Sequence, residues 1–224
     1  VYTRGDAVVE TYDHGGNLKQ ISYPDGSKET LSYSDDGLTS VVDSYGRSLT
    51  LTSRDHQIQS LTTPDGSITD YQYSNDGLLQ SVTRPDGHSR HYLYEDGRNS
   101  ALLTGIVDER GVRFASWTYD ADLKANSSEH AGGTEKTNIT YNADGSVTTT
   151  GALGHSRTLT FSAHNGVYQP DQVIDSAATG VNAGSTSYTF SSQGFLTRKT
   201  NQEGQAFGYA YNARGLETQR TSAD

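Results

Sequence analysis

The stretch YQYSNDGLLQSVTRPDG, residues 71–87, contains in order the features that decide the fold. Tyr71 and Tyr73 lie on one face of a strand, because successive side chains of a strand point to opposite faces. A polar segment that ends at Gly77 predicts a first turn. Pro85-Asp86-Gly87 predicts a second turn, because Pro fixes φ and Gly accepts a positive φ. Two short strands and two turns predict one β-hairpin.

The aromatic position of this stretch recurs along the whole chain. Equivalent positions are Tyr12, Tyr33, Ser53, Tyr73, Tyr94, Tyr119, Tyr141, Phe161, Phe190 and Tyr211. Their successive differences are 21, 20, 20, 21, 25, 22, 20, 29 and 21 residues. Such a period is typical of a tandem array in which each repeat is one supersecondary unit. We expect residues 1–224 to be a single array of about ten units and, since the chain starts at Val1 without any Met, a segment of a longer protein.

The second turn of each unit keeps its Gly even where the Pro is lost. A left-handed turn position has this requirement, which Gly meets without steric cost. The predicted turn glycines are Gly26, Gly46, Gly66, Gly87, Gly154 and Gly204. Between the turns, apolar pairs such as Leu18/Ile21 and Leu79/Val82 have a spacing of three that does not fit a regular strand, so we expect a β-bulge there.

The fold class that follows is all-β: tandem antiparallel hairpins in a coiled strip or part of a hollow β-shell. No window has the i, i+3, i+4, i+7 apolar pattern of a helix. A lone hairpin is marginally stable, so neighbouring hairpins must complete one another's ladders. A twisted sheet of many strands curls or closes, with the recurring aromatic rings along one face. Hydrophobic residues make up only 32% of the chain, so we expect no thick core.

The composition also limits the function. The net charge is −10, from 17 Lys+Arg and 27 Asp+Glu, which disfavours nucleic acid as a partner. The absence of Cys excludes disulfides and thiolate metal sites. No apolar run approaches the roughly 18 residues of a membrane span.

No motif predicts catalysis, a cofactor or a metal. His88 and His91 are three residues apart, an odd spacing that directs strand side chains to opposite faces. The Asp-rich turns lack the spaced acidic ligands of calcium loops, and turn chemistry explains them. Gly-x-Ser-x-Gly, P-loop and His-Glu-x-x-His motifs are absent. We therefore expect no catalytic, cofactor-binding or metal-binding residues and no enzymatic activity.

The repeat resembles the YD repeat of RHS-type proteins. The resemblance rests on YDHGGNLKQISYPDG (12–26), YQYSNDGLLQSVTRPDG (71–87), FASWTYDADLKANSSEHAGG (114–133) and FGYAYNARGLETQRT (207–221). It implies a hollow shell of spiralling hairpins that encloses a toxic polypeptide in bacterial polymorphic toxins and Tc-type complexes, or serves adhesion in teneurins. It also implies a secreted or bacterial cell-surface location, with the remainder of an RHS protein or a toxin cargo as partner. The Asp-Pro of the family's self-cleaving core segment is absent.

Two alternatives and two insertions remain open. The chain could be an adhesive or fibre-forming module whose terminal strand edges pair with further copies, or a carbohydrate-binding module that uses its tyrosines. Residues are inserted around Ala101–Val107 and at Asp175–Ser187. We interpret both insertions as loops, with a binding loop as the alternative.

Overall fold

The computed structural model describes residues 1–178, 180 and 182–222, and within them the chain is all-β, as predicted. The helical content of this described part is one 3-10 turn, Ala131–Gly133, and no α-helix. The chain divides into two compact units, Val1–Phe114 and Ala115–Asp224, with the boundary inside strand β12.

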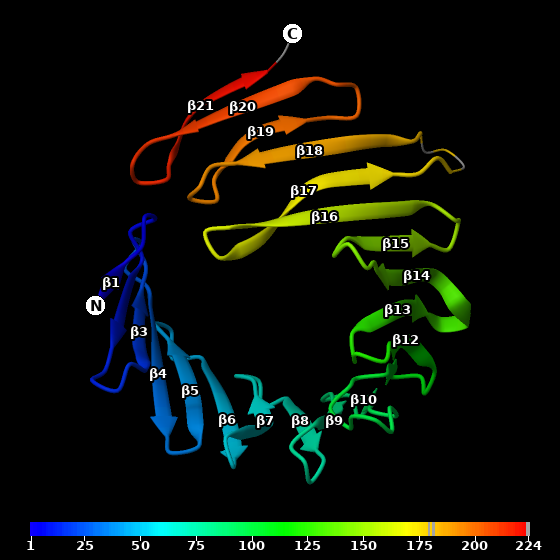
Figure 1. Cartoon of the computed structure of the whole chain (residues 1–224). Helices are drawn as coiled ribbons and strands as arrows, with labels where there is room; N and C mark the ends of the chain where they lie inside the picture. Colours follow the sequence, from blue (N-terminus) through cyan, green and yellow to red (C-terminus); the bar gives the residue numbers. More distant parts are fainter. Residues whose placement is uncertain (179, 181, 223–224) are drawn as a thin grey trace. The chain divides into compact units, whose positions relative to one another are not determined.

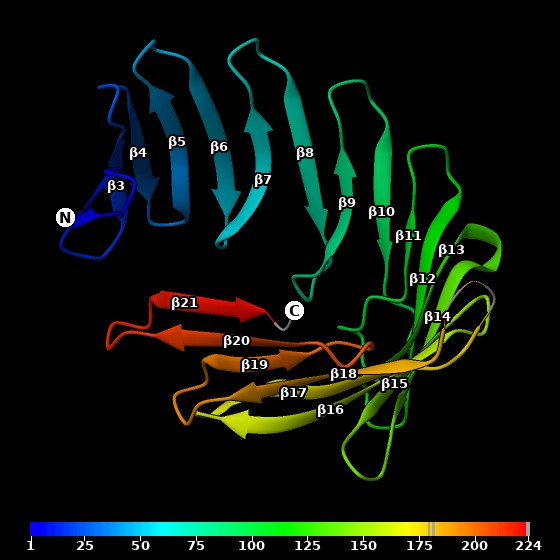
Figure 2. The same ribbon diagram turned by 90° about the horizontal axis from the view of Figure 1, so that it is seen from above.

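The first unit is an antiparallel meander in which each strand pairs with the next along the chain (Figure 1). Seen from above in Figure 2, strands β4 to β10 lie side by side in sequence order. The strands are β1 (Tyr2–Thr3), β2 (Val9–Tyr12), β3 (Leu18–Ser22), β4 (Lys28–Ser34), β5 (Gly37–Asp43), β6 (Ser48–Arg54), β7 (Gln57–Thr62), β8 (Ile68–Tyr73), β9 (Leu79–Thr83), β10 (Ser89–Leu93) and β11 (Gly105–Val107).

The second unit repeats the same meander. Its strands are β12 (Arg113–Tyr119), β13 (Ala125–His130), β14 (Thr134–Tyr141), β15 (Val147–Gly151), β16 (Ser156–His164), β17 (Val167–Asp175), β18 (Gly184–Phe190), β19 (Leu196–Thr200), β20 (Ala206–Tyr211) and β21 (Glu217–Ser222). Within each unit, hairpin follows hairpin without a crossover, which is the order that a tandem repeat of hairpins requires.

The apolar pairs at a spacing of three are explained by a β-bulge. In the β8–β9 hairpin Tyr73 pairs with Leu79 and Tyr71 with Val82, while Gln80 has no partner residue in the register. The extra residue turns Leu79 and Val82 to the face of the two tyrosines. A register shift of this kind lies at Tyr12, Tyr33, Ser53, Tyr73, Tyr119, Phe161, Phe190 and Tyr211.

Neither unit has a thick core. The buried hydrophobic residues are Val8 and Ala115, and no described side chain is fully buried. The rings along the strands are instead half-buried or exposed, which fits a chain with few apolar residues and many tyrosines. Stability must therefore come from strand ladders and from contacts between neighbouring hairpins rather than from a packed interior.

Both predicted insertion loops are in part strand. In the first, Gly105–Val107 forms β11 and pairs with β10, and Thr104 is buried beside it. The loop prediction is wrong there because a short insertion can extend the ladder when its amides find partners. In the second insertion, Asp175 ends β17 and Gly184 already belongs to β18. Of this second insertion, Thr179 and Val181 lie outside the described residues.

Candidate functional site: the ladder of turns and rings

Two backbone hydrogen bonds close most of the turns that join the strands. In the turn 63–67, the Gly66 amide donates to the Thr63 carbonyl (2.9 Å) and the Thr63 amide donates to the Ser67 carbonyl (2.9 Å). Gly66 has a φ of 83°, a left-handed conformation that other residues enter only with strain. The predicted turn glycines Gly26, Gly46, Gly66, Gly87, Gly154 and Gly204 have φ values of 78–87°.

Further residues take the same left-handed position. Gly16, Gly77, Gly111, Gly145, Gly194 and Gly215 have φ values of 75–85°. Most of them follow Asp, Asn or another polar residue, a signal that was visible in the sequence. In the turn 120–124 the position is held by Leu123, with a φ of 63°. Sequence reasoning missed Leu123 because a branched side chain is not expected at such a place.

A side-chain oxygen caps most of these turns. The amide of the fifth turn residue is the donor, and the acceptor stands at either the first or the third position. Asp43 Oδ1 accepts from the Arg47 amide (2.9 Å), whereas Asp65 Oδ1 accepts from the Ser67 amide (3.1 Å). Hydrogen bonds from the Thr63 hydroxyl and the Ser67 amide lower the pKa of Asp65. Asp65 is thus an ionised structural acceptor.

Two of the recurring rings link neighbouring hairpins directly. The Tyr33 hydroxyl donates to the Leu18 carbonyl (2.9 Å), and the Tyr141 hydroxyl donates to the Ala125 carbonyl (3.0 Å). Leu18 follows the turn 13–17, and Ala125 follows the turn 120–124. Each of these turns joins the two strands of the preceding hairpin. The ring therefore joins one repeat to the one before it.

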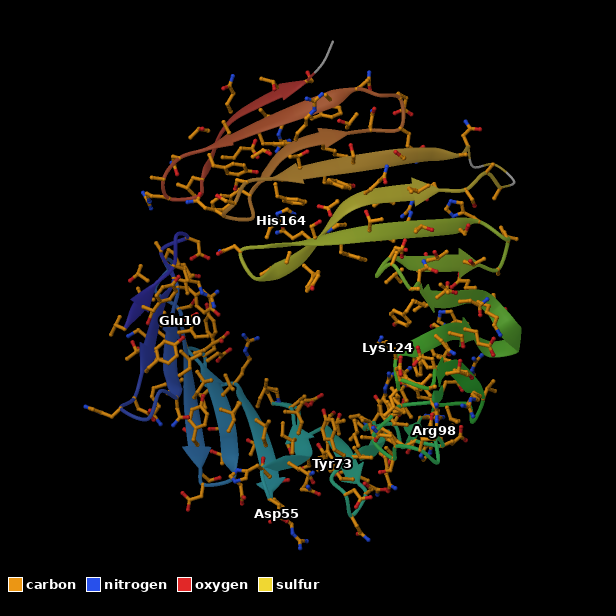
Figure 3. All side chains as sticks on the ribbon, in the orientation of Figure 1. Glu10, Asp55, Tyr73, Arg98, Lys124 and His164 are labelled. Carbon is orange, nitrogen blue, oxygen red and sulfur yellow. The ribbon has the colours of Figure 1, made fainter. Side chains whose placement is uncertain are left out.

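The other predicted rings have varied surroundings. Burial raises the pKa of Tyr73 (labelled in Figure 3) and that of Tyr94. The Tyr12 hydroxyl donates to Glu10 (2.5 Å), another residue labelled there. Phe190 lies against His164 with ring centroids 4.9 Å apart, Tyr211 stacks on Phe195 at 5.1 Å, Tyr119 pairs with Ala125, and Phe161 faces a groove.

In two repeats that have no tyrosine at the recurring aromatic position, a glutamine side chain links neighbouring hairpins. After Ser53, Gln57 Nε2 donates to the Gly77 carbonyl (3.1 Å), and after Phe161, Gln169 Nε2 donates to the Gly194 carbonyl (3.1 Å). Each acceptor belongs to the turn of the next hairpin. Both hairpins also have extended strands joined by two-residue loops, which place the glutamine close to that turn. The sequence period alone gives no sign of these glutamine links.

A family model described as RHS Repeat matches residues 53–89, which contain the β8–β9 hairpin with its ring, bulge and two turns. Residues 53–89 of the chain are thus similar to an RHS repeat.

Solved structures extend the likeness in fold to nearly the whole chain. A crystal structure of TcdB2-TccC3-Cdc42 matches with a TM-score of 0.58 and 13% identity over 98% of this chain. A crystal structure of TcdB2-TccC3 matches with 0.58 and 13% over 99%, and a Photorhabdus luminescens Tc holotoxin pore with 0.57 and 13% over 98%. The chain spans 14% of the length of each of those chains. A search of curated proteins found no match in sequence. At this identity the likeness concerns the fold.

An ion cluster around Asp175 ties hairpins of the second unit together. Asp175 is 5% exposed and accepts from Arg157 Nε (2.8 Å) and Gln202 Nε2 (3.0 Å), with His155 Nε2 at 3.2 Å. The Arg157 guanidinium lowers the pKa of Asp175. These partners come from β16, its preceding turn and the β19–β20 turn, so the cluster crosses three hairpins.

The described part of the chain shows no constellation for metal binding. No group of three or more His, Asp or Glu residues is placed there to hold an ion. His88 lies at the surface, with Nδ1 3.4 Å from its turn neighbour Asp86. The described residues also form no helix that is long and apolar enough to cross a membrane. What the described side chains build is a ladder of links between hairpins.

Proposed function

We propose that this chain is a non-enzymatic wall segment of a secreted or bacterial cell-surface RHS protein, and that the wall encloses or presents a toxic polypeptide. The structural role rests on one observation: 98% of the chain matches in fold 14% of a much longer chain of a Tc complex. The described polar side chains support it, because they are used to join hairpins. Residues 1–224 would then act as one repeat array of about ten units.

The partners follow from this role. The remainder of the same RHS protein would continue the ladder, and the enclosed polypeptide would lie against the face that carries the rings. Apolar side chains such as Leu79 and Val82 share this face with the rings, so the face offers half-buried apolar surface to an unfolded chain. No cofactor is required for such a role.

Limited proteolysis of the full-length product of the gene tests the proposal. A polypeptide enclosed by the wall should resist cleavage while the wall is intact. Replacing Tyr33 and Tyr141 by Ala removes two links between hairpins and should accelerate cleavage of the enclosed polypeptide by about tenfold. Tyr45→Ala is the matched control, because that ring is 81% exposed in a turn. Equal cleavage rates in all variants, or no resistant polypeptide, would refute enclosure.

Self-assembly is the second candidate function, and one strand favours it. Every residue of β21 is exposed, and the strand pairs only with β20 among the described residues. Such an edge is a template for another strand. If the chain forms fibres, light scattering at micromolar concentration should show polymers that Thr221→Pro or Gln219→Pro shortens. A monodisperse monomer would leave the wall as the better explanation.

A further inference from the structure

One turn of the second unit holds an ammonium group between a ring and a carboxylate. Lys124, labelled in Figure 3, is the fifth residue of the turn 120–124. Its Nζ lies 5.1 Å from the ring centroid of Tyr141, in the next hairpin, and 4.0 Å from Asp122 Oδ2. A cation over a ring face and beside a carboxylate gains from the ring quadrupole and from the opposite charge.

The following turn keeps the ring and the carboxylate but lacks the ammonium. Turn 142–146 has the same two closing bonds, from Asn142 to Ser146 (2.8 Å) and from Gly145 to Asn142 (3.0 Å). By position in the turn, Ser146 replaces Lys124 and Asp144 replaces Asp122. The ring of the next hairpin is Phe161, which stands where Tyr141 stands one repeat earlier.

A groove of about 540 Å³ opens at this place. Its lining residues are Asp144, Gly145, Ser146, Thr160, Phe161 and Tyr168. No lysine or arginine is among these six residues. Phe161 is 37% exposed and Tyr168 is 76% exposed, so both rings are available to a ligand. Tyr168 lies at the start of β17, in the hairpin whose other strand ends at His164, labelled in Figure 3.

One oxygen of the Asp144 carboxylate in the groove accepts hydrogen bonds, and the other does not. The Ser146 amide (2.9 Å) and hydroxyl (2.7 Å) both donate to Asp144 Oδ1. These two bonds lower the pKa of Asp144, so it is ionised at neutral pH. Within the described residues, Oδ2 of Asp144 accepts no hydrogen bond. The groove therefore combines one available anionic oxygen with two ring faces.

We propose that this groove binds an alkylammonium group, supplied by a lysine side chain of a partner polypeptide. The ammonium would lie between Asp144 and the Phe161 ring, as the Lys124 ammonium lies between Asp122 and the Tyr141 ring, and the methylene stem would lie along Tyr168. The chain's net charge of −10 favours the approach of a basic partner. The inference goes beyond a wall function, because it assigns a specific ligand chemistry to one repeat.

An NMR titration of the ¹⁵N-labelled chain tests the proposal. The ligands are Nα-acetyl-lysine methylamide, whose side-chain ammonium is free, n-butylammonium chloride and the neutral Nα-acetyl-norleucine methylamide. Saturable shifts should appear at residues 144–146 and 168 with the lysine amide, at an affinity about fivefold above that of the norleucine amide. Binding of the lysine amide that is weaker than that of butylammonium would refute the polypeptide source. Equal binding of the neutral analogue would refute the ammonium.

Variants give the test its controls. Asp144→Asn should weaken lysine-amide binding about fivefold, and Ser146→Lys should abolish it by supplying the ammonium internally. Lys124→Ser should create a second site, with new shifts at residues 122 and 141, because it empties the equivalent place. Lys124 is half exposed, so the fold should survive its replacement. Unchanged titrations in Asp144→Asn and Lys124→Ser, with intact spectra, would overturn the assignment.

Discussion

At the scale of single residues, the backbone of Leu123 stands out. Its φ of 63° places it where the next turn has Gly145, with a φ of 83°. A left-handed conformation costs a residue with a Cβ about 1–2 kcal/mol. We expect Leu123→Gly to raise the free energy of unfolding by about 1 kcal/mol, measured by urea denaturation.

The equivalent change in the neighbouring turn is the control. A Cβ at Gly145 would meet no atom within 4 Å, so Gly145→Ala tests backbone strain alone. It should destabilise the chain by about the amount that Leu123→Gly gains. Destabilisation by Leu123→Gly would show that the packing of the leucine outweighs its strain.

The capping carboxylates make stability depend on pH. Hydrogen bonds to the Ser27 hydroxyl and amide lower the pKa of Asp25, the His88 amide lowers that of Asp86, and Arg98 lowers that of Asp96 to about 2. A carboxyl whose pKa is depressed by folding stabilises the native state above its unfolded pKa. That contribution is lost as pH falls below the ordinary value of 3.8 toward 2.

We therefore expect the urea midpoint to fall steeply between about pH 4 and pH 2. Asn at positions 25, 65 and 86 keeps a side-chain acceptor but takes up no proton in this range. The triple variant should give a flatter profile than the natural chain. A profile of the same slope would mean that the turns do not govern acid unfolding.

At the scale of the hairpin, the hydroxyl-to-carbonyl link should have a measurable energy. Tyr33→Phe removes the donor to the Leu18 carbonyl and keeps the ring, so we expect a loss of about 1 kcal/mol in unfolding free energy. No hydrogen bond from the Tyr73 hydroxyl is found in the described part, so Tyr73→Phe is the control and should change little. Equal losses in both variants would assign the effect to solvation of the phenol instead.

The sequence allowed the ring positions and turn glycines to be located because a period of about 20 residues survives insertion and substitution. It could not place the extra residue of the bulge, since a spacing of three between Leu79 and Val82 does not say which residue leaves the ladder. Nor could it show that Gln57 and Gln169 would link their hairpins to the next one. The dipeptide Asn165-Gly166, with φ values of 50° and 78°, is typical of a two-residue hairpin loop. The period of the aromatic positions alone does not predict this loop.

At the scale of the whole chain, the absence of a thick core has a consequence for cooperativity. When stability is a sum of contacts between neighbouring repeats, a local lesion should spread over a few hairpins and then fade. Each of the two units, Val1–Phe114 and Ala115–Asp224, is compact by itself. We expect a lesion in one unit to leave the other unit protected against hydrogen exchange.

Gly66→Val and Gly154→Val form a matched pair for this prediction. Their φ values are 83° and 78°, and an added Cβ at either would meet nothing within 4 Å, so both variants introduce strain of about 1–3 kcal/mol. In hydrogen-exchange mass spectrometry, Gly66→Val should raise exchange in β7 and β8 and leave β15 and β16 unchanged, and Gly154→Val should do the reverse. Each variant would thus report on the unit that the other spares. Faster exchange throughout both units in either variant would mean that the array unfolds as one cooperative body, and that its repeats are coupled more strongly than links between neighbours allow.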